Sequence, residues 1–334
     1  MKSDSPIEVF STCPPSSRVP KEQYLERLID IAQWSESAGC TGILVFSDNS
    51  LLDPWALSHL IIQHTRTLRP LVAIQPVYMH PYWVAKQITT LSYLHGRRLD
   101  LNMVAGGFKN DLEALSDSTP HDQRYTRLTE YTTVIMRLLT NGAPVSYDGE
   151  FHRVSKLKLQ PPLLPDLVPD VFVSGSSEAG IAAARTLGAV AIKYPKPSAE
   201  EAPQEPSDLR LGIRVGILAR PTESDAWDVA QARFHDDRKG QITRQLAEKV
   251  SDSVWHKQLA GIGPAVEGSV YWLTPFQNYQ AMCPYLVGSY AQVADELARY
   301  FGAGYRSIIL DTPPDPEELT HTFEVLDAAL HPVQ

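Results

Sequence analysis

The side chains best suited to chemistry in this sequence gather in short segments beside predicted strands and helices. One such segment is Ser174-Gly175-Ser176-Ser177, which lies between an apolar run and a helical pattern. Small residues let a ligand approach the backbone, and free amide groups at a helix start, together with serine hydroxyls, form an anion site. A simple helix cap by Ser176 or Ser177 explains the same pattern equally well.

Two further segments add polar groups at strand or helix ends. Asn102 interrupts the apolar run Leu99–Ala105, which predicts a strand. A buried amide needs hydrogen-bond partners, and either a heterocycle with imide edges or the neighbouring backbone could supply them. His121 or Asp122 can cap the helix predicted after them, which places Tyr125 in its first turns. The Tyr125 hydroxyl could then donate to a phosphate, although a plain capped helix start remains an alternative.

Two single side chains are candidate catalytic groups. Arg214 lies in an apolar run that predicts a strand, and its guanidinium could stabilise negative charge. His80 follows the third predicted strand and could act as a base near pH 7. A loop histidine without a catalytic role is an equally good explanation of His80.

Short apolar runs alternate with helical patterns along the whole chain, which predicts a parallel sheet closed into a (β/α)8 TIM barrel within one domain, residues 1–334. A doubly wound sheet is the alternative, but no glycine follows the first predicted strand as a phosphate loop would require. The predicted strands are Ile7–Cys13, Ile43–Phe46, Leu68–Pro76, Leu99–Ala105, Val171–Ser174, Val190–Tyr194, Leu211–Leu218 and Ser307–Leu310. The predicted helices are Glu22–Ala38, Trp55–His64, Tyr82–Leu94, Gln123–Leu139, Glu178–Leu187, Asp225–Leu259, Ala291–Tyr300 and Glu317–Leu330.

Two segments depart from the alternation. Asp148–Pro165 predicts a hairpin-like insertion. Pro195–Asp208 contains four prolines, so the sixth helix of the barrel is expected to be reduced or absent.

Composition narrows the class of protein. The chain has 39 acidic and 30 basic residues and a net charge of −9, which disfavours binding to nucleic acid. No stretch approaches the roughly 20 apolar residues that span a bilayer, and the first residues do not form a signal peptide. Cys13, Cys40 and Cys283 are scattered without metal-ligand spacing. They indicate reduced thiols in a cytoplasmic protein, and no metal site is expected.

In their order and separation these segments resemble the luciferase-like flavin monooxygenases, and among them most the alkanesulfonate monooxygenase branch. The resemblance rests on a His-x-x-Arg-Tyr stretch at His121–Tyr125, a strand ending Asn-x-Val-x-Gly, and the Gly-Ser-Ser turn. It extends to Tyr147–Leu159 and to Gly288–Ala294, which leads to Gly304–Ser307. It implies a TIM barrel with an insertion region, commonly a homodimer or homotetramer.

The resemblance also implies a cofactor and a reaction. Reduced FMN, supplied by a separate flavin reductase, would lie across the mouth of the barrel and react with O2 to a peroxyflavin that oxygenates a small organic substrate. Asn102 would contact the flavin ring, and Tyr194 would lie beside it. The residues expected to hold the ribityl chain and phosphate are His121, Tyr125, Ser176 and Ser177, and Ser174 and Gly175 are also expected to bind the cofactor.

The sequence departs from the alkanesulfonate branch on the substrate side. Leu51 and Leu52 stand where that branch has a cysteine, and Gly216 stands where it has a histidine after the strand arginine. The loop Trp272–Leu286 lacks the expected arginine. A sulfonate needs charge-assisted donors, so we do not expect simple alkanesulfonates as substrates.

The segment 261–286 is a candidate lid over the active site. Its aromatic side chains, among them Phe276 and Tyr279, could cover a substrate and exclude water. An ordered loop packed on the barrel rim is the alternative. Two other functions stay open: an F420-dependent oxidoreductase, and a flavin-binding protein without catalysis.

Overall fold

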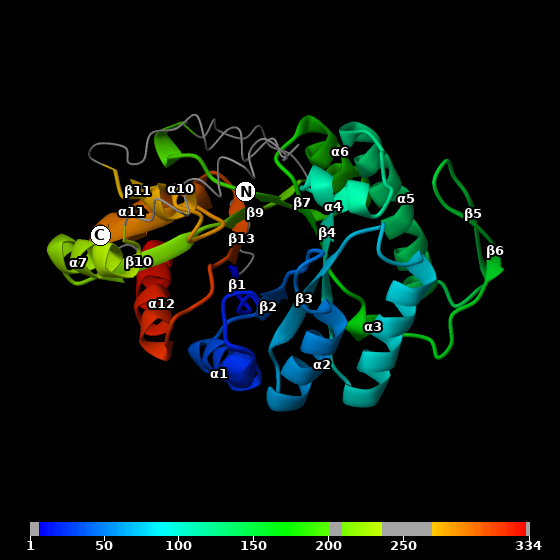
Figure 1. The fold of residues 1–334 in the computed structure, drawn as a ribbon, viewed down its shortest axis with the longest axis horizontal. Coiled ribbons are helices and arrows are strands. Elements are labelled where there is room, and N and C mark those ends of the chain that lie inside the picture. Colours follow the sequence, from blue (N-terminus) through cyan, green and yellow to red (C-terminus); the bar gives the residue numbers. More distant parts are fainter. Residues whose placement is uncertain (1–6, 201–208, 236–268, 332–334) are drawn as a thin grey trace.

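Eight parallel strands form a closed barrel at the centre of the molecule (Figure 1). The computed structural model describes residues 7–200, 209–235 and 269–331. Around the barrel the order is β1-β13-β9-β8-β7-β4-β3-β2, so the predicted TIM barrel is confirmed. The barrel strands are β1 (Glu8–Thr12), β2 (Gly42–Val45), β3 (Arg69–Ile74), β4 (Asp100–Val104), β7 (Val171–Ser174), β8 (Val190–Lys193), β9 (Arg210–Arg214) and β13 (Tyr305–Ile309).

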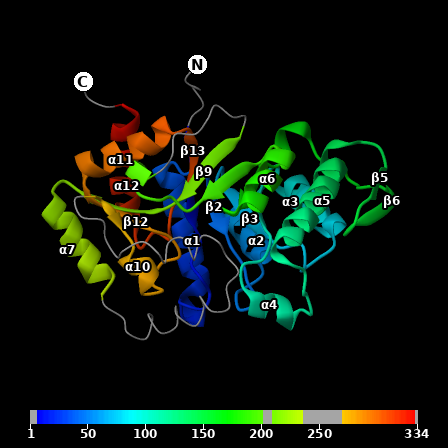
Figure 2. The ribbon, with the colours of Figure 1, turned by 90° about the horizontal axis from the view of Figure 1, so that it is seen from above.

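Helices surround the barrel, as the view from above shows (Figure 2). Their ends follow local chemistry: Asp53 caps α2 by accepting from the Ala56 amide, and Gly39 ends α1 at a φ of 97°. No helix among the described residues is long and apolar enough to cross a membrane. The helices are α1 (Lys21–Ala38), α2 (Pro54–His64), α3 (Pro81–His95), α4 (Lys109–Ala114), α5 (His121–Thr140), α6 (Glu178–Leu187), α7 (Glu223–Arg233), α10 (Thr274–Gln277), α11 (Tyr290–Gly302) and α12 (Pro316–Leu330).

The interior of the barrel is filled by alternate residues of its strands. Because side chains alternate across a strand, one set points outward to the helices and the other points inward. The inward set forms a buried cluster of Phe10, Leu44, Leu71, Phe172, Val190, Ile192 and Ile309. Two residues further along each strand, the next inward side chains face the carboxyl end of the barrel.

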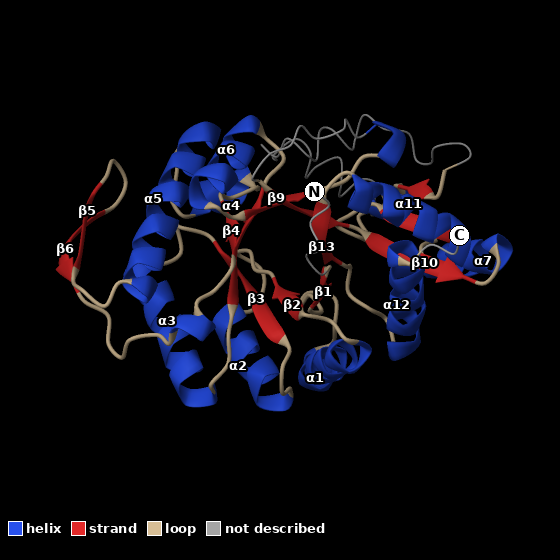
Figure 3. Cartoon of the chain, turned by 180° about the vertical axis from the view of Figure 1, so that it is seen from behind, coloured by secondary structure: helices blue, strands red, loops and turns tan. Residues whose placement is uncertain are grey.

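Two connections carry the predicted irregularities. The strands β5 (Val145–Asp148) and β6 (Arg153–Leu157) pair as a hairpin before the short turn η1 (Pro165–Leu167). This hairpin lies at the edge of the molecule opposite α7 (Figures 1 and 3). Between β8 and β9 the described residues form only the 3-10 turn η2 (Ser198–Glu200), which fits a reduced sixth helix.

The predicted seventh strand, Leu211–Leu218, is wrong as a single element. Its first part is β9 of the barrel, whereas β10 (Gly216–Arg220) belongs to a second sheet with β12 (Tyr285–Ser289) and β11 (Tyr271–Trp272). The chain changes sheets at Val215, whose amide donates to the Ile309 carbonyl oxygen at 3.0 Å, an ordinary hydrogen-bond length. Apart from Arg214 the run is apolar, because both sheets are buried.

Other predicted elements near this sheet also change. The candidate lid segment 261–286 contains β11, α10 and the start of β12 within its described part. Of the predicted helix Asp225–Leu259, α7 accounts for the beginning, and residues 236–259 lie outside the described part of the chain.

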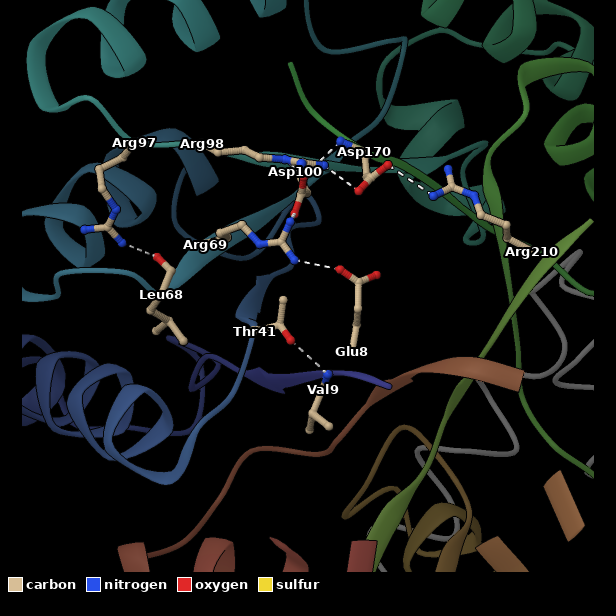
Figure 4. A network of polar contacts seen from close by, with 10 residues as sticks. All are labelled: Glu8, Val9, Thr41, Leu68, Arg69, Arg97, Arg98, Asp100, Asp170 and Arg210. Atoms are coloured by element: carbon tan, nitrogen blue, oxygen red, sulfur yellow. Dashed lines mark hydrogen bonds and ion pairs between the residues drawn. The ribbon is translucent and has the colours of Figure 1, made fainter. Parts of the chain in front are cut away.

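The amino ends of the barrel strands are joined by a network of charges (Figure 4). Asp100 is fully buried, between the guanidinium groups of Arg69 at 3.2 Å and Arg98 at 3.0 Å. Ion pairs then extend from Arg69 to Glu8, from Arg98 to Asp170, and from Arg210 to Asp170. The three carboxylates and three guanidinium groups balance one another across several strands.

Candidate active site

The carboxyl ends of the barrel strands and the loops after them surround a cavity of about 1020 Å³. Ligand sites of TIM barrels lie at this face, and a cavity of this size holds a cofactor together with a substrate. The side chains that line it from the strands and the residues just beyond them include Thr12, Phe46, Ala73, Asn102, Ser174, Tyr194, Arg214 and Asp311.

One wall of the cavity is the turn between β7 and α6. Ser177 caps α6, since its hydroxyl accepts from the Gly180 amide at 3.1 Å. The Ser176 hydroxyl is buried and has no hydrogen-bond partner among the described residues. The helix cap therefore accounts for Ser177 alone. Ser176 retains a hydroxyl at the amino end of a helix, where an anion is favoured.

Tyr125 and Gly175 are in close contact in this turn. A Cβ atom added to Gly175 would lie 2.3 Å from the Tyr125 hydroxyl oxygen, so only glycine fits. Burial raises the pKa of Tyr125, and a hydrogen bond with Ser177 opposes this shift only in part. The phenol thus stays protonated at neutral pH, and its hydroxyl lies beside the turn as a donor.

His121 stands next to Tyr125, with the two rings edge to face at 5.3 Å. The expected cap by His121 or Asp122 is wrong, because α5 begins at His121 itself after Pro120. The two side chains instead contact each other, with His121 Nδ1 2.7 Å from the Asp122 carboxylate. His121 and Tyr125 both line the cavity.

The turn that leads into α5 is fixed by an ion pair. Arg127 donates to both carboxylate oxygens of Asp117, at 2.7 and 3.1 Å, and Thr119 donates to the same carboxylate. Burial alone would raise the pKa of Asp117, but the hydrogen bonds from Arg127 and Thr119 lower it to about 2.

This lowered pKa predicts a pH-dependent contribution to stability. A depressed carboxyl pKa stabilises the fold above the unfolded value near 4, and the contribution is lost as the pH falls toward 2. Asp117→Asn should therefore cost about 1–2 kcal/mol at pH 7 and progressively less below pH 4. Melting temperatures of both proteins between pH 7 and pH 2.5 measure this. The exposed Asp148–Arg153 pair supplies the control Asp148→Asn, and a constant difference between wild type and Asp117→Asn over that range would contradict the prediction.

Asn102 and Ser174 lie side by side at the floor of the cavity. The Ser174 hydroxyl donates to Asn102 Oδ1 at 2.8 Å, across the paired strands β4 and β7. The carboxamide is 4% exposed, and its orientation is fixed by this bond. Its amide nitrogen makes no hydrogen bond within the described part of the chain, so it is placed to donate to a ligand.

Arg214 brings a buried positive charge to the same floor. Its Nη1 donates to the Tyr194 hydroxyl at 3.4 Å, while its buried Nε has no partner among the residues described. Burial lowers the pKa of Arg214, but Tyr194, Cys283 and Asp311 together outweigh burial and raise it. The guanidinium therefore stays charged and can receive an anion or a partly negative oxygen.

The candidate lid reaches the cavity only in part. Tyr279 lines the cavity, whereas Phe276 is 5% exposed and packs in the core without lining it. Arg18 donates to the carbonyls of Tyr279 and Gln280, at 2.8 and 2.6 Å. Residues 261–268 of the segment lie outside the described part of the chain. Within the rest, residues 278–282 and Tyr285 line the cavity, and Arg18 ties 279–280 to the loop after β1.

His80 lies away from the cavity lining. It precedes α3 and caps that helix, because its Nδ1 accepts from the Tyr82 amide at 3.2 Å. The structure thus favours the alternative explanation, a loop histidine without a catalytic role. Among the described residues, no group of three His, Cys, Asp or Glu side chains is placed to hold a metal ion.

Sequence reasoning missed several residues of the lining. Asp311 lies two residues after the eighth barrel strand, at the end of the barrel where a carboxylate indicates function in this fold. Tyr285 comes from the unpredicted strand β12, so no strand-end rule could have found it. Cys13 follows β1 but does not line the cavity, and burial raises its pKa to about 12, so its thiol is protonated and unreactive near neutral pH.

Comparison with known proteins identifies the family. The model of the luciferase-like monooxygenases matches residues 7–307, so the chain belongs to this family, and the resemblance predicted from its motifs is confirmed. A 4-(gamma-L-glutamylamino)butanoyl-[BtrI acyl-carrier protein] monooxygenase, BtrO from Niallia circulans, is 34% identical over 322 residues and 94% of each chain. This enzyme and the family model place the chain among the monooxygenases.

Solved structures share the fold. The EDTA monooxygenase EmoA from Chelativorans sp. BNC1 superimposes with a TM-score of 0.74 at 18% identity, over 98% of this chain and 95% of that one. The long-chain alkane monooxygenase LadA gives a TM-score of 0.73 at 15% identity, over 97% of this chain and 91% of that one.

Proposed function

We propose that the protein is a two-component monooxygenase that uses reduced FMN to insert one atom of O2 into a small organic substrate. The observation that carries this proposal is the turn at Gly175-Ser176-Ser177, where an orphaned buried hydroxyl and a glycine cradle meet the start of α6. When bound, reduced flavin supplies the two electrons with which the second oxygen atom leaves as water.

The residues around this turn fit the phosphate end of FMN. Ser176 and Tyr125 present hydroxyl donors, Ser177 caps the helix, and His121 stands at the edge of the same wall. Asn102 and Tyr194 line the cavity further along, where the ring of the flavin would lie. The amide of Asn102 would donate to an acceptor of the ring.

Other side chains would act on the reacting groups. The Arg214 guanidinium would stabilise negative charge that develops on oxygen, because it is buried and keeps an unused donor. Tyr279 and its neighbours would exclude water from the cavity while the substrate is bound.

The partners and substrate follow from the same proposal. No nicotinamide-binding motif occurs in the sequence, so a separate flavin reductase would supply reduced FMN. The relative BtrO is named for a substrate carried by an acyl-carrier protein, so carrier-bound acyl groups belong among the substrates to assay. Leu51 and Gly216 stand where the alkanesulfonate monooxygenases have polar groups, so we do not propose sulfonates as substrates.

Two further features of the protein belong to the proposal. Three free, buried thiols support a cytoplasmic location. We also propose a homodimer or homotetramer, supported by Trp83, Tyr93 and Leu94, which are 51%, 75% and 62% exposed on α3. Light scattering of the purified protein measures its oligomeric state, and the mass of a monomer would contradict the proposed homodimer or homotetramer.

The cofactor is tested by anaerobic titration with reduced FMN and, separately, with F420. We expect tighter binding of FMN, and we expect Ser176→Ala and Tyr125→Phe each to weaken it by about 1 kcal/mol or more, the effect of one lost hydrogen bond. Ser155→Ala, on the exposed face of the β5–β6 hairpin, is the matched control and should leave binding unchanged.

Each outcome distinguishes a specific alternative. Tighter binding of F420 would replace the proposal with an F420-dependent oxidoreductase. Binding of FMN without oxygen uptake in the presence of a reductase and any substrate assayed would favour a flavin-binding protein without catalysis. Unchanged FMN binding in both variants would remove the β7–α6 turn from the site.

A further inference from the structure

Asp311 brings a carboxylate to the cavity floor, and its electrostatic effect on Arg214 is the one role assigned to it above. It follows β13 by two residues, and Ile309 before it points into the barrel interior, so alternation directs Asp311 toward the cavity that it lines. In the β9–β13 ladder, Arg214 is paired with Ile309. The carboxylate and the guanidinium therefore stand on neighbouring strands at the same end of the barrel.

Tyr285 holds Asp311 in place. Its hydroxyl donates to Asp311 Oδ2 at 2.8 Å. Burial and the nearby Asp311 carboxylate raise the pKa of Tyr285 well above its usual value, so the phenol keeps its proton and remains the donor. Phe234 packs edge to face on the Tyr285 ring at 4.8 Å, which restricts the ring further.

Gly216 explains how the Tyr285 ring reaches this position. The two residues are partners in the β10–β12 ladder. A Cβ atom on Gly216 would lie 2.4 Å from ring atoms of Tyr285, so any larger residue would displace the ring and with it the hydrogen bond to Asp311. Gly216, Tyr285 and Asp311 thus form one unit built on three strands.

The second oxygen of this carboxylate is available to a ligand. Within the described part of the chain, Asp311 forms no ion pair, and its one side-chain hydrogen bond there is from the Tyr285 hydroxyl to Oδ2. A carboxylate removed from bulk water is costly unless a positive or strongly donating group compensates it. Arg214 supplies part of this compensation from the neighbouring strand, because Asp311 helps to raise its pKa, but it forms no ion pair with Asp311. Oδ1 faces the ligand cavity and can therefore accept from a nitrogen donor of the substrate.

We propose that Asp311 binds a nitrogen donor of the substrate, and that the enzyme selects substrates bearing an amine. Tyr285 is the positioning residue of this contact. The assignment of a substrate class rests on the proposed monooxygenase function, but binding of the amine group by Asp311 can be measured without turnover.

The test compares two ligands of equal length, n-pentylamine and 1-pentanol, by calorimetric titration into the full-length protein saturated with FMN. The hydrocarbon chain is the same, so the difference in affinity reports the ammonium group. We expect wild type to bind the amine at least about tenfold more tightly, as a charge-assisted hydrogen bond provides. Asp311→Asn should reduce the preference to within about twofold, and leave the affinity for 1-pentanol and FMN unchanged.

Two further variants separate positioning from general structure. Tyr285→Phe keeps the ring above Gly216 and should reduce the amine preference by about threefold or more without changing FMN binding. Glu317→Gln removes an equal charge from the exposed first turn of α12, where the side chain is 81% exposed, and should change nothing. The wild-type comparison needs no variant and so stays informative if Asp311→Asn fails to fold.

Amine binding no tighter than alcohol binding in wild type, including no measurable binding of either, overturns the proposal. So does a preference that survives in a folded Asp311→Asn protein. If FMN does not bind, the proposed function fails, and the same titration without flavin still decides the role of Asp311.

Discussion

Gly175→Ala is expected to weaken FMN binding by at least about tenfold, the largest effect of any single methyl group in the cavity wall. The new Cβ atom would stand 2.3 Å from the Tyr125 hydroxyl oxygen and 3.1 Å from its Cζ. Tyr125 cannot simply move aside, because it is 8% exposed and packs against His121 and Gly180. The turn must therefore shift, and Ser176 shifts with it.

The double variant Gly175→Ala, Tyr125→Phe tests this cause. Removal of the hydroxyl oxygen eliminates the worst overlap and leaves contacts of 3.1 and 3.3 Å, which small adjustments relieve. The double variant should therefore bind FMN more tightly than Gly175→Ala alone, although it lacks one hydrogen bond. Fluorescence quenching of FMN measures both affinities.

Gly302→Ala is the matched control, because a Cβ atom there meets nothing within 4 Å and lies in helix α11. It should leave FMN affinity unchanged and stabilise the fold slightly. If Gly175→Ala binds FMN as wild type does, the turn at the end of β7 does not hold the cofactor.

The barrel could be predicted because each of its strands can be recognised from a short stretch of sequence. Each barrel strand is a short apolar run between helical patterns, and that pattern depends on neighbours in sequence. Asn102 and Arg214 stood out because a polar residue in a buried strand needs a partner, and a strand end in this fold faces the ligand cavity. These two side chains were therefore placed on the cavity from sequence alone.

The parts that failed depend on contacts between distant segments. Apart from Arg214, Leu211–Leu218 contains no charged or polar side chain, and its division at Val215 follows from pairing with β12, some seventy residues later in the chain. Tyr285 reaches the cavity only because of that pairing. No local periodicity contains this information.

Helix caps and ligand sites use the same residue types, which is why some assignments could not be decided in advance. Ser176 and Ser177 are equivalent in the sequence, and only the position of the Gly180 amide shows that Ser177 is the cap. His80 and His121 are equally ambiguous, because a histidine before a helix can bind backbone or ligand. The structure places the first on the Tyr82 amide and the second in the cavity wall.

Asp100→Ala is expected to have the largest effect on stability, a loss of about 3–5 kcal/mol. The Asp100 side chain is fully buried between Arg69 and Arg98, and its Oδ1 also accepts from the Asp170 amide at 2.9 Å. Burial raises the pKa of Asp100, while the two arginines oppose that shift. Without the carboxylate, the guanidinium groups of Arg69 and Arg98 would face each other at the amino ends of the barrel strands, with no negative charge between them (Figure 4).

Urea unfolding of wild type and variant gives this difference in free energy. The exposed pair Lys109–Glu113, at 3.6 Å and with both side chains 58% exposed, supplies the control Glu113→Ala, which should change stability by less than about 0.5 kcal/mol. Adding Arg69→Met to Asp100→Ala should recover part of the loss, because it removes the one positive charge by which the network then exceeds its carboxylates.

The ion-pair network around Asp100 should affect the stability of the fold without affecting the cofactor site, because the two lie at opposite ends of the barrel. It lies at the amino ends of the strands, whereas the cavity lies at their carboxyl ends, so the folded Asp100→Ala protein should bind FMN with wild-type affinity. A loss below about 1 kcal/mol would show that the network contributes little net stability, as some buried ion pairs do. Weakened FMN binding in the folded variant would show instead that the two ends of the barrel are coupled through β3 and β4, the strands that carry Arg69 and Asp100.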